Sequence, residues 1–152
     1  MGAVYFYHLT QASVAQTLAM LLDKSRQAGW VIEVRGTDPA AMARLDQALW
    51  AGPPEGFLPH GLAGGDHDAD QPILLTTGQG AANAPTCVMS VDGADVTPDE
   101  VRASERACVI FDGHDGDAVA RARVQWKALT DAGCKAQYWS QESGRWEMKA
   151  ER

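Results

Sequence analysis

The strongest constraint on the fold of this chain is the alternation of strand-type and helix-type segments with which it opens. Val4–Leu9 is a continuous run of β-forming residues, typical of a strand buried on both faces. The apolar residues that then recur at helical spacing are Val14, Leu18, Leu21 and Leu22. Trp30–Arg35 is a second strand-type run, and Asp38 followed by Pro39 indicates the start of a second helix. A β-α-β-α order of this kind favours a parallel sheet with right-handed crossover connections.

The rest of the chain continues the mixed pattern, with one long interruption. Further strands are expected at residues 73–77, 86–91 and 107–111, and a terminal β-hairpin at 135–140 and 145–148. A capping box at Thr97–Glu100 opens a short helix, and a long helix is expected from about Asp115 to Ala132. Residues 52–71 show no periodicity and predict a long loop. We therefore expect one mixed α/β domain over residues 1–152, with helices flanking a mostly parallel sheet.

The composition is that of an ordinary globular protein, with 45% hydrophobic and 22% charged residues. The net charge of −7 argues against broad binding to nucleic acid, which requires a basic face. The cysteines Cys87, Cys108 and Cys134 lack the spacing of a metal site or a disulfide framework, so free thiols are expected. Without a signal peptide or a membrane-spanning run, we expect a soluble, cytoplasmic protein that makes no membrane contact.

Motifs for nucleotide binding and nucleophilic catalysis are missing from the sequence. The turn after the first strand, His8–Gln11, has no glycine that would let a phosphate approach, and there is neither a P-loop nor a dinucleotide fingerprint. Gly78 and Gly80 are better explained by a turn between strands. No serine lies in a nucleophile elbow. We therefore expect no nucleotide and no other cofactor.

Two acidic, histidine-containing segments each allow two interpretations. The first comprises His60, Asp66, His67, Asp68 and Asp70. A solvated loop explains it better than a metal site, because metal ligands must converge from rigid elements, and His60 is expected to hold the loop through backbone groups. The second, Asp112–Asp115, follows a strand, where α/β enzymes often place active residues, although a turn and helix cap explain it too. A small hydrolase or nucleotide-dependent enzyme using Asp112, His114 or His60 is the alternative function.

The long loop and the last helix carry apolar residues whose role the sequence leaves open. Those of the loop are Trp50, Phe57, Leu58 and Leu62, which either pack onto the domain or receive a partner. In the last helix, Arg123, Trp126 and Lys127 share one face at i, i+3 and i+4. A tryptophan between two cations suits the capture of an acidic, apolar peptide. Alternatively, Trp126 packs inward and the cations only solvate the helix.

Several of these segments together resemble the chi subunit family of bacterial DNA polymerase III. The similarity rests on Leu45–Trp50, on the Phe-x-Pro-His motif at Phe57–His60, and on Leu62–Gly64. It extends to the opening strand, the C-terminal helix and the stop at Ala132-Gly133, and so covers most of the chain. The resemblance implies a Rossmann-like α/β fold that neither binds nucleotide nor catalyses a reaction by itself.

The resemblance also implies a function. Chi is an accessory subunit of the clamp-loader assembly, where it commonly pairs with the psi subunit. Its recognised role is to bind the acidic, Phe-terminated C-terminal tail of single-stranded DNA-binding protein, so that contact with nucleic acid is indirect. We therefore expect a non-catalytic replication subunit with three partners: this tail, the clamp-loader complex and, where the organism has one, psi.

The family's tail-binding pocket carries over by position. The family tryptophan and phenylalanine correspond to Trp50 and Phe57, and the helix arginine and lysine correspond to Arg123 and Lys127. Trp126 stands where the family has a tyrosine. The resemblance thus implies an apolar slot formed by Trp50, Phe57 and Trp126. Arg123 would pair with the terminal carboxylate of the tail, and Lys127 would attract its aspartates.

Two details complete the implied site. Pro59 and His60 are expected to shape the loop that carries Phe57. A further basic residue of the family falls near Val119 in this chain, which leaves Arg121 as the candidate substitute.

Overall fold

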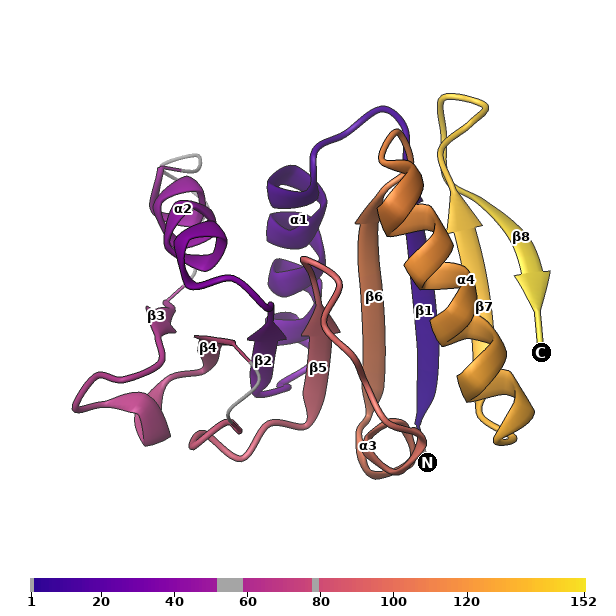
Figure 1. Ribbon diagram of the computed structural model, residues 1–152. Coiled ribbons are helices and arrows are strands. Elements are labelled where there is room, and N and C mark those ends of the chain that lie inside the picture. Colours follow the sequence, from indigo (N-terminus) through magenta and orange to yellow (C-terminus); the bar gives the residue numbers. More distant parts are fainter. Residues whose placement is uncertain (1, 52–58, 78–79) are drawn as a thin grey trace.

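The computed structural model describes residues 2–51, 59–77 and 80–152, and has one sheet with helices on both faces (Figure 1). The strands are β1 (Ala3–Leu9), β2 (Ile32–Arg35), β3 (Gly61–Leu62), β4 (Ile73–Thr76), β5 (Cys87–Ser90), β6 (Arg106–Asp112), β7 (Lys135–Ser140) and β8 (Glu147–Glu151). Their order across the sheet is β3-β4-β2-β5-β6-β1-β7-β8. The paired strands are parallel except for β7 and β8, which are antiparallel. The expected fold class, including the C-terminal hairpin, is confirmed.

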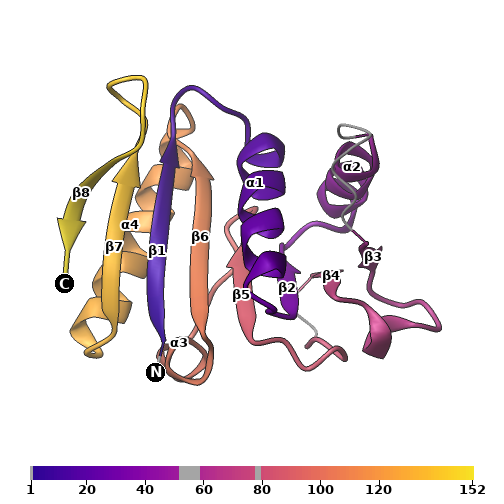
Figure 2. The same cartoon turned by 180° about the vertical axis from the view of Figure 1, so that it is seen from behind.

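The helices divide between the two faces of the sheet. They are α1 (Val14–Gln27), α2 (Pro39–Trp50), α3 (Pro98–Ala103) and α4 (Gly116–Asp131), with a short 3-10 helix, η1 (Asp68–Asp70). Helices α1 and α2 cover one face, and α3 and α4 cover the other (Figures 1 and 2). Right-handed crossovers produce this division when the strand order reverses direction. None of the helices described is long and apolar enough to cross a membrane.

The core consists of two apolar layers, one on each face of the sheet. The layer beneath α1 and α2 includes Leu18, Leu22, Ile32, Val34, Ile73 and Leu75. The layer beneath α3 and α4 includes Val4, Phe6, Val101, Val109 and Leu129. Neighbouring residues of one strand point to opposite faces. Accordingly, Cys87 and Met89 of β5 lie in the first layer and Val88 lies in the second.

Local sequence explains where the α-helices begin. The residues that cap them are Ser13, Asp38, Thr97 and Asp115. Ser13 forms a capping box with Gln16, and Thr97 forms one with Glu100, so the first backbone N–H groups of α1 and α3 have acceptors. The helix starts expected at Asp38, at Thr97 and near Asp115 are therefore confirmed.

Strand β2 begins at Ile32 and not at Trp30, and two further strands differ from the expectation. The segment expected to be a loop contains β3, which pairs with Leu74 and Leu75 of β4. A strand of two residues is too short to show a periodic pattern, so the sequence could not predict it. Strand β8 covers Glu147–Glu151 instead of residues 145–148, because its backbone continues to pair with β7 through charged residues that carry no strand signal.

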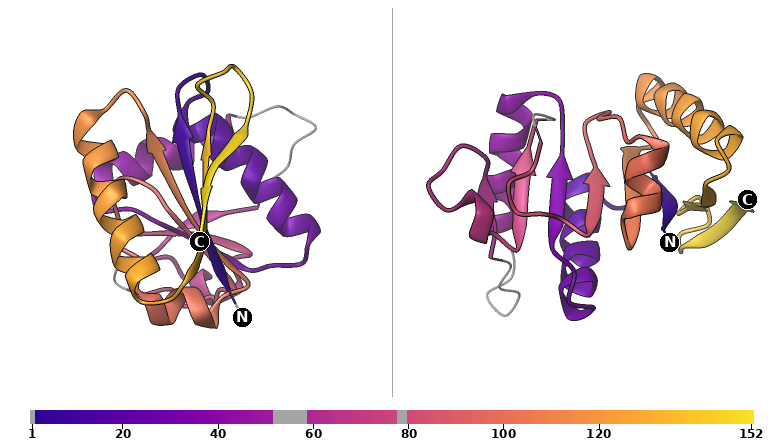
Figure 3. Two further views of the ribbon diagram at one scale, coloured as in Figure 1. Left: turned by 90° about the vertical axis from the view of Figure 1, so that its right-hand side faces the viewer. Right: turned by 90° about the horizontal axis from the view of Figure 1, so that it is seen from below.

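The sheet twists along its width, so its strands fan out when the molecule is viewed from the β8 edge (Figure 3). Helix α2 lies toward one end, near β3 and β4, whereas α4 lies toward the other end, over β6, β1 and β7 (Figure 1). This arrangement determines which of the candidate residues can share a site.

Candidate functional site

A cavity of about 380 Å³ lies beside α4, where that helix faces β1 and the C-terminal hairpin. Its lining residues are His8, Arg123, Trp126, Tyr138, Ser140, Glu142, Lys149 and Ala150. Arg123 and Trp126 of the expected site are thus brought together. They lie one turn apart on α4, and β7 supplies the opposite wall.

Trp126 both packs inward and lines this cavity. Its ring meets Phe6 edge to face, with centroids 5.3 Å apart, and meets Tyr138 at 5.8 Å. The side chain is only partly buried and packs against the apolar layer beneath α4. The two alternatives left open by the sequence are therefore not exclusive. One edge of the indole anchors α4, and the remainder offers an apolar wall.

The charges around the cavity are predominantly positive. Arg123 and Lys149 are cationic, and Glu142 is the acidic residue among the lining residues described. The pKa of His8 is lowered, mainly by burial and also by Arg123, so this imidazole is neutral at pH 7. Its Nδ1 lies 2.8 Å from the hydroxyl of Tyr138, whose own pKa is raised by burial. The cavity therefore combines aromatic walls with neutral hydrogen-bonding groups and two cations.

Sequence reasoning missed the part of this cavity that comes from the sheet. His8, Tyr138 and Lys149 lie far apart in the chain and meet because β1 pairs with β7, and β7 with β8. The available signal was the expected terminal hairpin, which carries Tyr138. What the sequence did not show was that this hairpin would pair with the first strand.

Lys127, Val119 and Arg121 lie outside the lining of this cavity. The ammonium group of Lys127 forms an exposed ion pair with Asp131 at 2.7 Å. Val119 packs against the apolar layer beneath α4. The guanidinium of Arg121 lies so close to Gly93 that a Cβ there would be 2.0 Å from Nη1. Arg121 therefore lies at the turn after β5, outside the lining of this cavity.

Trp50 occupies a different surface. It is the last residue of α2, it is 51% exposed, and its ring stacks on His60 with centroids 4.2 Å apart. His60 is buried, and its Nε2 lies 3.4 Å from the carbonyl oxygen of Asp46. This contact joins the segment after Pro59 to α2. Phe57 lies outside the described residues.

Among the described residues, Trp50 and Trp126 of the expected slot are not brought together. Trp50 ends a helix on one face near the β3 end of the sheet, whereas Trp126 belongs to a helix on the opposite face (Figures 1 and 2). The lining of the α4 cavity includes no residue of α2 among those the structure describes. In the described part of the chain, Trp50 and Trp126 therefore lie on two surfaces.

The candidate catalytic and metal-binding residues have roles in turns. His114 donates its backbone N–H to Asp112, and its ring nitrogen Nε2 lies 3.0 Å from the carbonyl oxygen of Thr10. The carboxylate of Asp68 accepts the backbone N–H groups of Gly64 and Gly65. In the described part of the chain, no group of three His, Cys, Asp or Glu residues could hold a metal ion.

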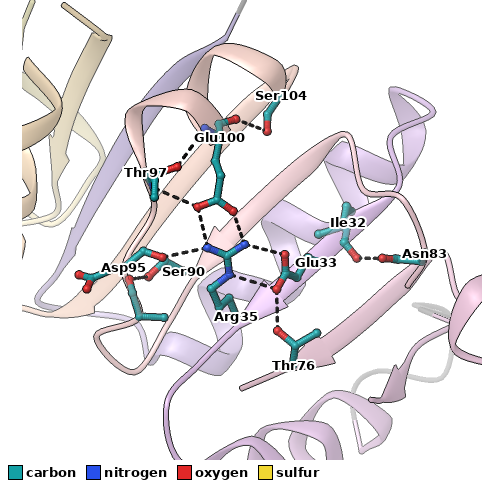
Figure 4. Close-up of polar contacts among 11 residues, drawn as sticks. Ile32, Glu33, Arg35, Thr76, Asn83, Ser90, Asp95, Thr97, Glu100 and Ser104 are labelled. Atoms are coloured by element: carbon teal, nitrogen blue, oxygen red, sulfur yellow. Dashed lines mark hydrogen bonds and ion pairs between the residues drawn. The ribbon is translucent and has the colours of Figure 1, made fainter. Parts of the chain in front are cut away.

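A polar cluster joins β2, β4 and α3 (Figure 4). Arg35 donates to both carboxylate oxygens of Glu33 and of Glu100, and to the carbonyl oxygen of Asp95. The hydroxyl of Thr76 donates to Glu33 at 2.6 Å. Pairing with Arg35 lowers the pKa of Glu100 to about 2, and the two carboxylates raise that of Arg35. Because these groups satisfy one another, we interpret the cluster as structural.

Two comparisons with known proteins point to the same family. A family model described as "DNA polymerase III chi subunit, HolC" matches residues 1–137. A curated relative, DNA polymerase III subunit chi of Pseudomonas aeruginosa, is 31% identical over 86 residues. That alignment covers 55% of this chain and 59% of the relative's length.

Proposed function

This chain belongs to the DNA polymerase III chi subunit family, and on that premise we propose that it is a non-catalytic accessory subunit of the replicase. In this role it binds the acidic, Phe-terminated tail of single-stranded DNA-binding protein in the α4 cavity and joins the clamp-loader assembly. Such a subunit works at the replication fork, which places it in the cytoplasm. Contact with DNA is made through its partner, in keeping with the net charge of −7.

The observation that carries this proposal is the position of Arg123 beside the aromatic rings of Trp126 and Tyr138. A C-terminal phenylalanine requires an apolar wall for its ring and a cation for its carboxylate. A guanidinium can hold a carboxylate through two parallel hydrogen bonds. Lys149 adds a second positive charge for the acidic residues that precede the phenylalanine.

We assign the separate surface around Trp50 to a second partner, the psi subunit. Trp50 and Leu62 are 51% and 40% exposed, and both belong to the α2–β3 end of the sheet. Large apolar side chains exposed near one another mark protein interfaces more often than isolated ones do. Since this end lies away from α4, both partners can bind at the same time.

Titration calorimetry with a peptide of acidic residues ending in phenylalanine tests the tail-binding proposal. We expect micromolar affinity, about 8 kcal/mol, as is usual for a short docked peptide. The substitution Arg123→Ala should weaken binding at least ~10-fold, because a charge-assisted bidentate contact is lost. Removing the terminal phenylalanine from the peptide should have an equal or larger effect.

The matched control is Arg121→Ala, which removes the same charge from the same helix. Because Arg121 lies beside Gly93 and outside the cavity, this variant should bind the peptide nearly as well as the original protein. Equal losses in the two variants would show that α4 attracts the peptide only through its overall charge, and the proposed pocket would be rejected.

A further inference from the structure

A second cavity, of about 370 Å³, lies between α1 and the strands β1, β6 and β7. It is on the face of the sheet opposite α4. Its aromatic lining residues are Tyr5, Tyr7, Trp30, Trp139 and Trp146. All five are partly buried, and the rings of Tyr7 and Trp146 meet edge to face at 5.4 Å. The volume falls within the range of about 300–1,000 Å³ that is usual for small-molecule pockets.

The polar groups of this cavity are hydrogen-bond donors. The guanidinium carbon of Arg106 lies 4.1 Å from the ring centroid of Tyr5 and 5.3 Å from that of Trp30. Such ring contacts engage the flat face of a guanidinium and leave its N–H groups for an acceptor. Lys24 provides a second cation. Within the described ranges, neither cation has a carboxylate within ion-pair distance.

Two hydroxyl groups add to this donor set. Ser25 lines the cavity and is only 7% exposed. Burial raises the pKa of the Tyr7 phenol, which therefore stays protonated and able to donate a hydrogen bond. The part of the lining that the structure describes contains no Asp or Glu. A site with this chemistry would repel a cationic ligand. An uncharged aromatic ring would fit the walls but would offer the hydrogen-bond donors no acceptor.

Two of the aromatic residues that line the cavity, Trp139 and Trp146, come after the last residue of the family match. The family model ends at residue 137, whereas Trp139 belongs to β7 and Trp146 lies just before β8. The part of the hairpin that carries these two tryptophans therefore lies outside the match.

We propose that this cavity binds a small aromatic carboxylate, with its ring against Tyr7, Trp139 and Trp146 and its carboxylate at Arg106. Charge complementarity selects an anion, because the described residues that face the space include two cations and no acid. The planar fork of a guanidinium matches a carboxylate in two-point contact. The aromatic walls add stacking that an aliphatic anion cannot use.

The experiment compares naphthalene-1-acetate with its uncharged amide, using calorimetry and the indole N–H signals of Trp30, Trp139 and Trp146. We expect the acid to bind and to shift these signals. The amide should bind at least ~10-fold more weakly, since contacts to a charged group are stronger than neutral ones. Equal affinity of acid and amide, or shifts confined to Trp50 and Trp126, would overturn the proposal.

Variants locate the site. Arg106→Gln should weaken binding of the acid at least ~10-fold, and the exposed Lys24→Gln should weaken it a further ~2- to 3-fold. Lys24 is exposed on the surface of α1, so Lys24→Gln should keep the fold. It therefore tests the site even where Arg106→Gln fails to fold. Arg123→Gln, in the other cavity, should leave the affinity unchanged. Loss of binding in Arg123→Gln, with none in Arg106→Gln and Lys24→Gln, would reject the assignment.

A competition arm separates this site from the tail-binding pocket. The Phe-terminated acidic peptide should not displace naphthalene-1-acetate, because the two cavities are on opposite faces of the sheet. Displacement would show that the acid occupies the tail site and would overturn the inference. A protein that fails to bind the peptide but binds the acid would contradict the proposed function alone.

Discussion

Arg35 of β2 and Glu100 of α3 form a two-point ion pair across a sequence separation of 65 residues. Nη1 of Arg35 donates to Oε1 of Glu100 at 2.9 Å, and Nη2 donates to Oε2. The same guanidinium donates to both carboxylate oxygens of Glu33, which is buried at 2% exposure (Figure 4). One arginine thus connects a short helix to the middle of the sheet and neutralises a buried acid.

The first prediction concerns the acid stability that Glu100 provides. Its pKa in the folded protein is about 2, against an ordinary value of 4.5, so its contribution is fully present above about pH 5 and is lost as the pH falls toward 2. Glu100→Gln keeps the acceptor for the α3 cap but removes the charge. We expect the free energy of unfolding to fall by about 1–2 kcal/mol at pH 7, allowing for partial exposure to solvent. Urea unfolding from pH 7 to pH 2 measures this difference.

The control for this prediction is Asp99→Asn, one residue away. The Asp99 side chain is 97% exposed and pairs with the exposed Arg102, so replacing its charge should change stability little at any pH. If Glu100→Gln is as stable as the original protein at pH 7, the ion pair with Arg35 contributes nothing and the prediction fails.

The second prediction concerns the buried acid Glu33. Arg35→Met leaves this carboxylate buried without its cation, and the free energy of unfolding should fall by about 3–5 kcal/mol. The double variant Glu33→Gln with Arg35→Met removes the buried charge as well and should recover part of that loss. A double-variant cycle in urea measures the coupling. If the two losses simply add, the carboxylate and the guanidinium do not depend on each other.

Much of the fold could be predicted from the sequence, because most elements carry their own local signals. The runs at β1 and β6 are continuous segments of β-forming residues, and the capping box at Thr97 is visible as a short motif. The pairing that places Arg35 beside Glu100 could not be predicted. It depends on which strands become neighbours, and a residue pattern within one segment carries no information about that.

The third prediction concerns Gln141, whose side-chain oxygen accepts the backbone N–H groups of Thr10, Gln11 and Ala12 at 3.2–3.3 Å. Gln141 follows β7, so this contact ties the C-terminal hairpin to the connection between β1 and α1. Gln141→Ala should lower the free energy of unfolding by about 1–2 kcal/mol, because three partly buried donors lose their acceptor. Hydrogen exchange of these three amides should become faster.

Gln27→Ala is the matched control, since Gln27 makes only an exposed side-chain contact with Asp23 on α1. This variant should change neither stability nor the exchange of residues 10–12. Unchanged exchange of those amides in Gln141→Ala would mean that other groups hold the connection.

The candidate site was predictable only within one helix. The spacing of Arg123 and Trp126 predicted a shared face, and both residues do line one cavity. Spacing places Lys127 on the same face as Arg123, but its ammonium group forms an exposed ion pair with Asp131, and Lys127 does not line the cavity. Residue spacing could not predict whether Trp50 lies near this pocket. Trp50 belongs to another helix, and its position depends on which face of the sheet each crossover helix covers.

The last prediction separates the two surfaces by function. If the tail peptide binds beside Arg123, then Trp50→Ala should leave its affinity within ~2-fold, while Arg123→Ala weakens it at least ~10-fold. Trp50→Ala should instead weaken association with psi, because it removes an aromatic ring that is 51% exposed at the α2 end. Peptide affinity should also fall as salt is raised, since screening weakens the attraction between exposed charges. Calorimetry with the peptide and with purified psi measures both interactions on the same set of variants.

The design includes its own control, because each substitution serves as the reference for the other surface. Arg123→Ala should bind psi normally, just as Trp50→Ala should bind the peptide normally. A loss of peptide binding in Trp50→Ala, with unchanged thermal stability, would mean that Trp50 contacts the tail peptide. In that case the single slot implied by the family resemblance would be restored, and the two-surface assignment would be wrong.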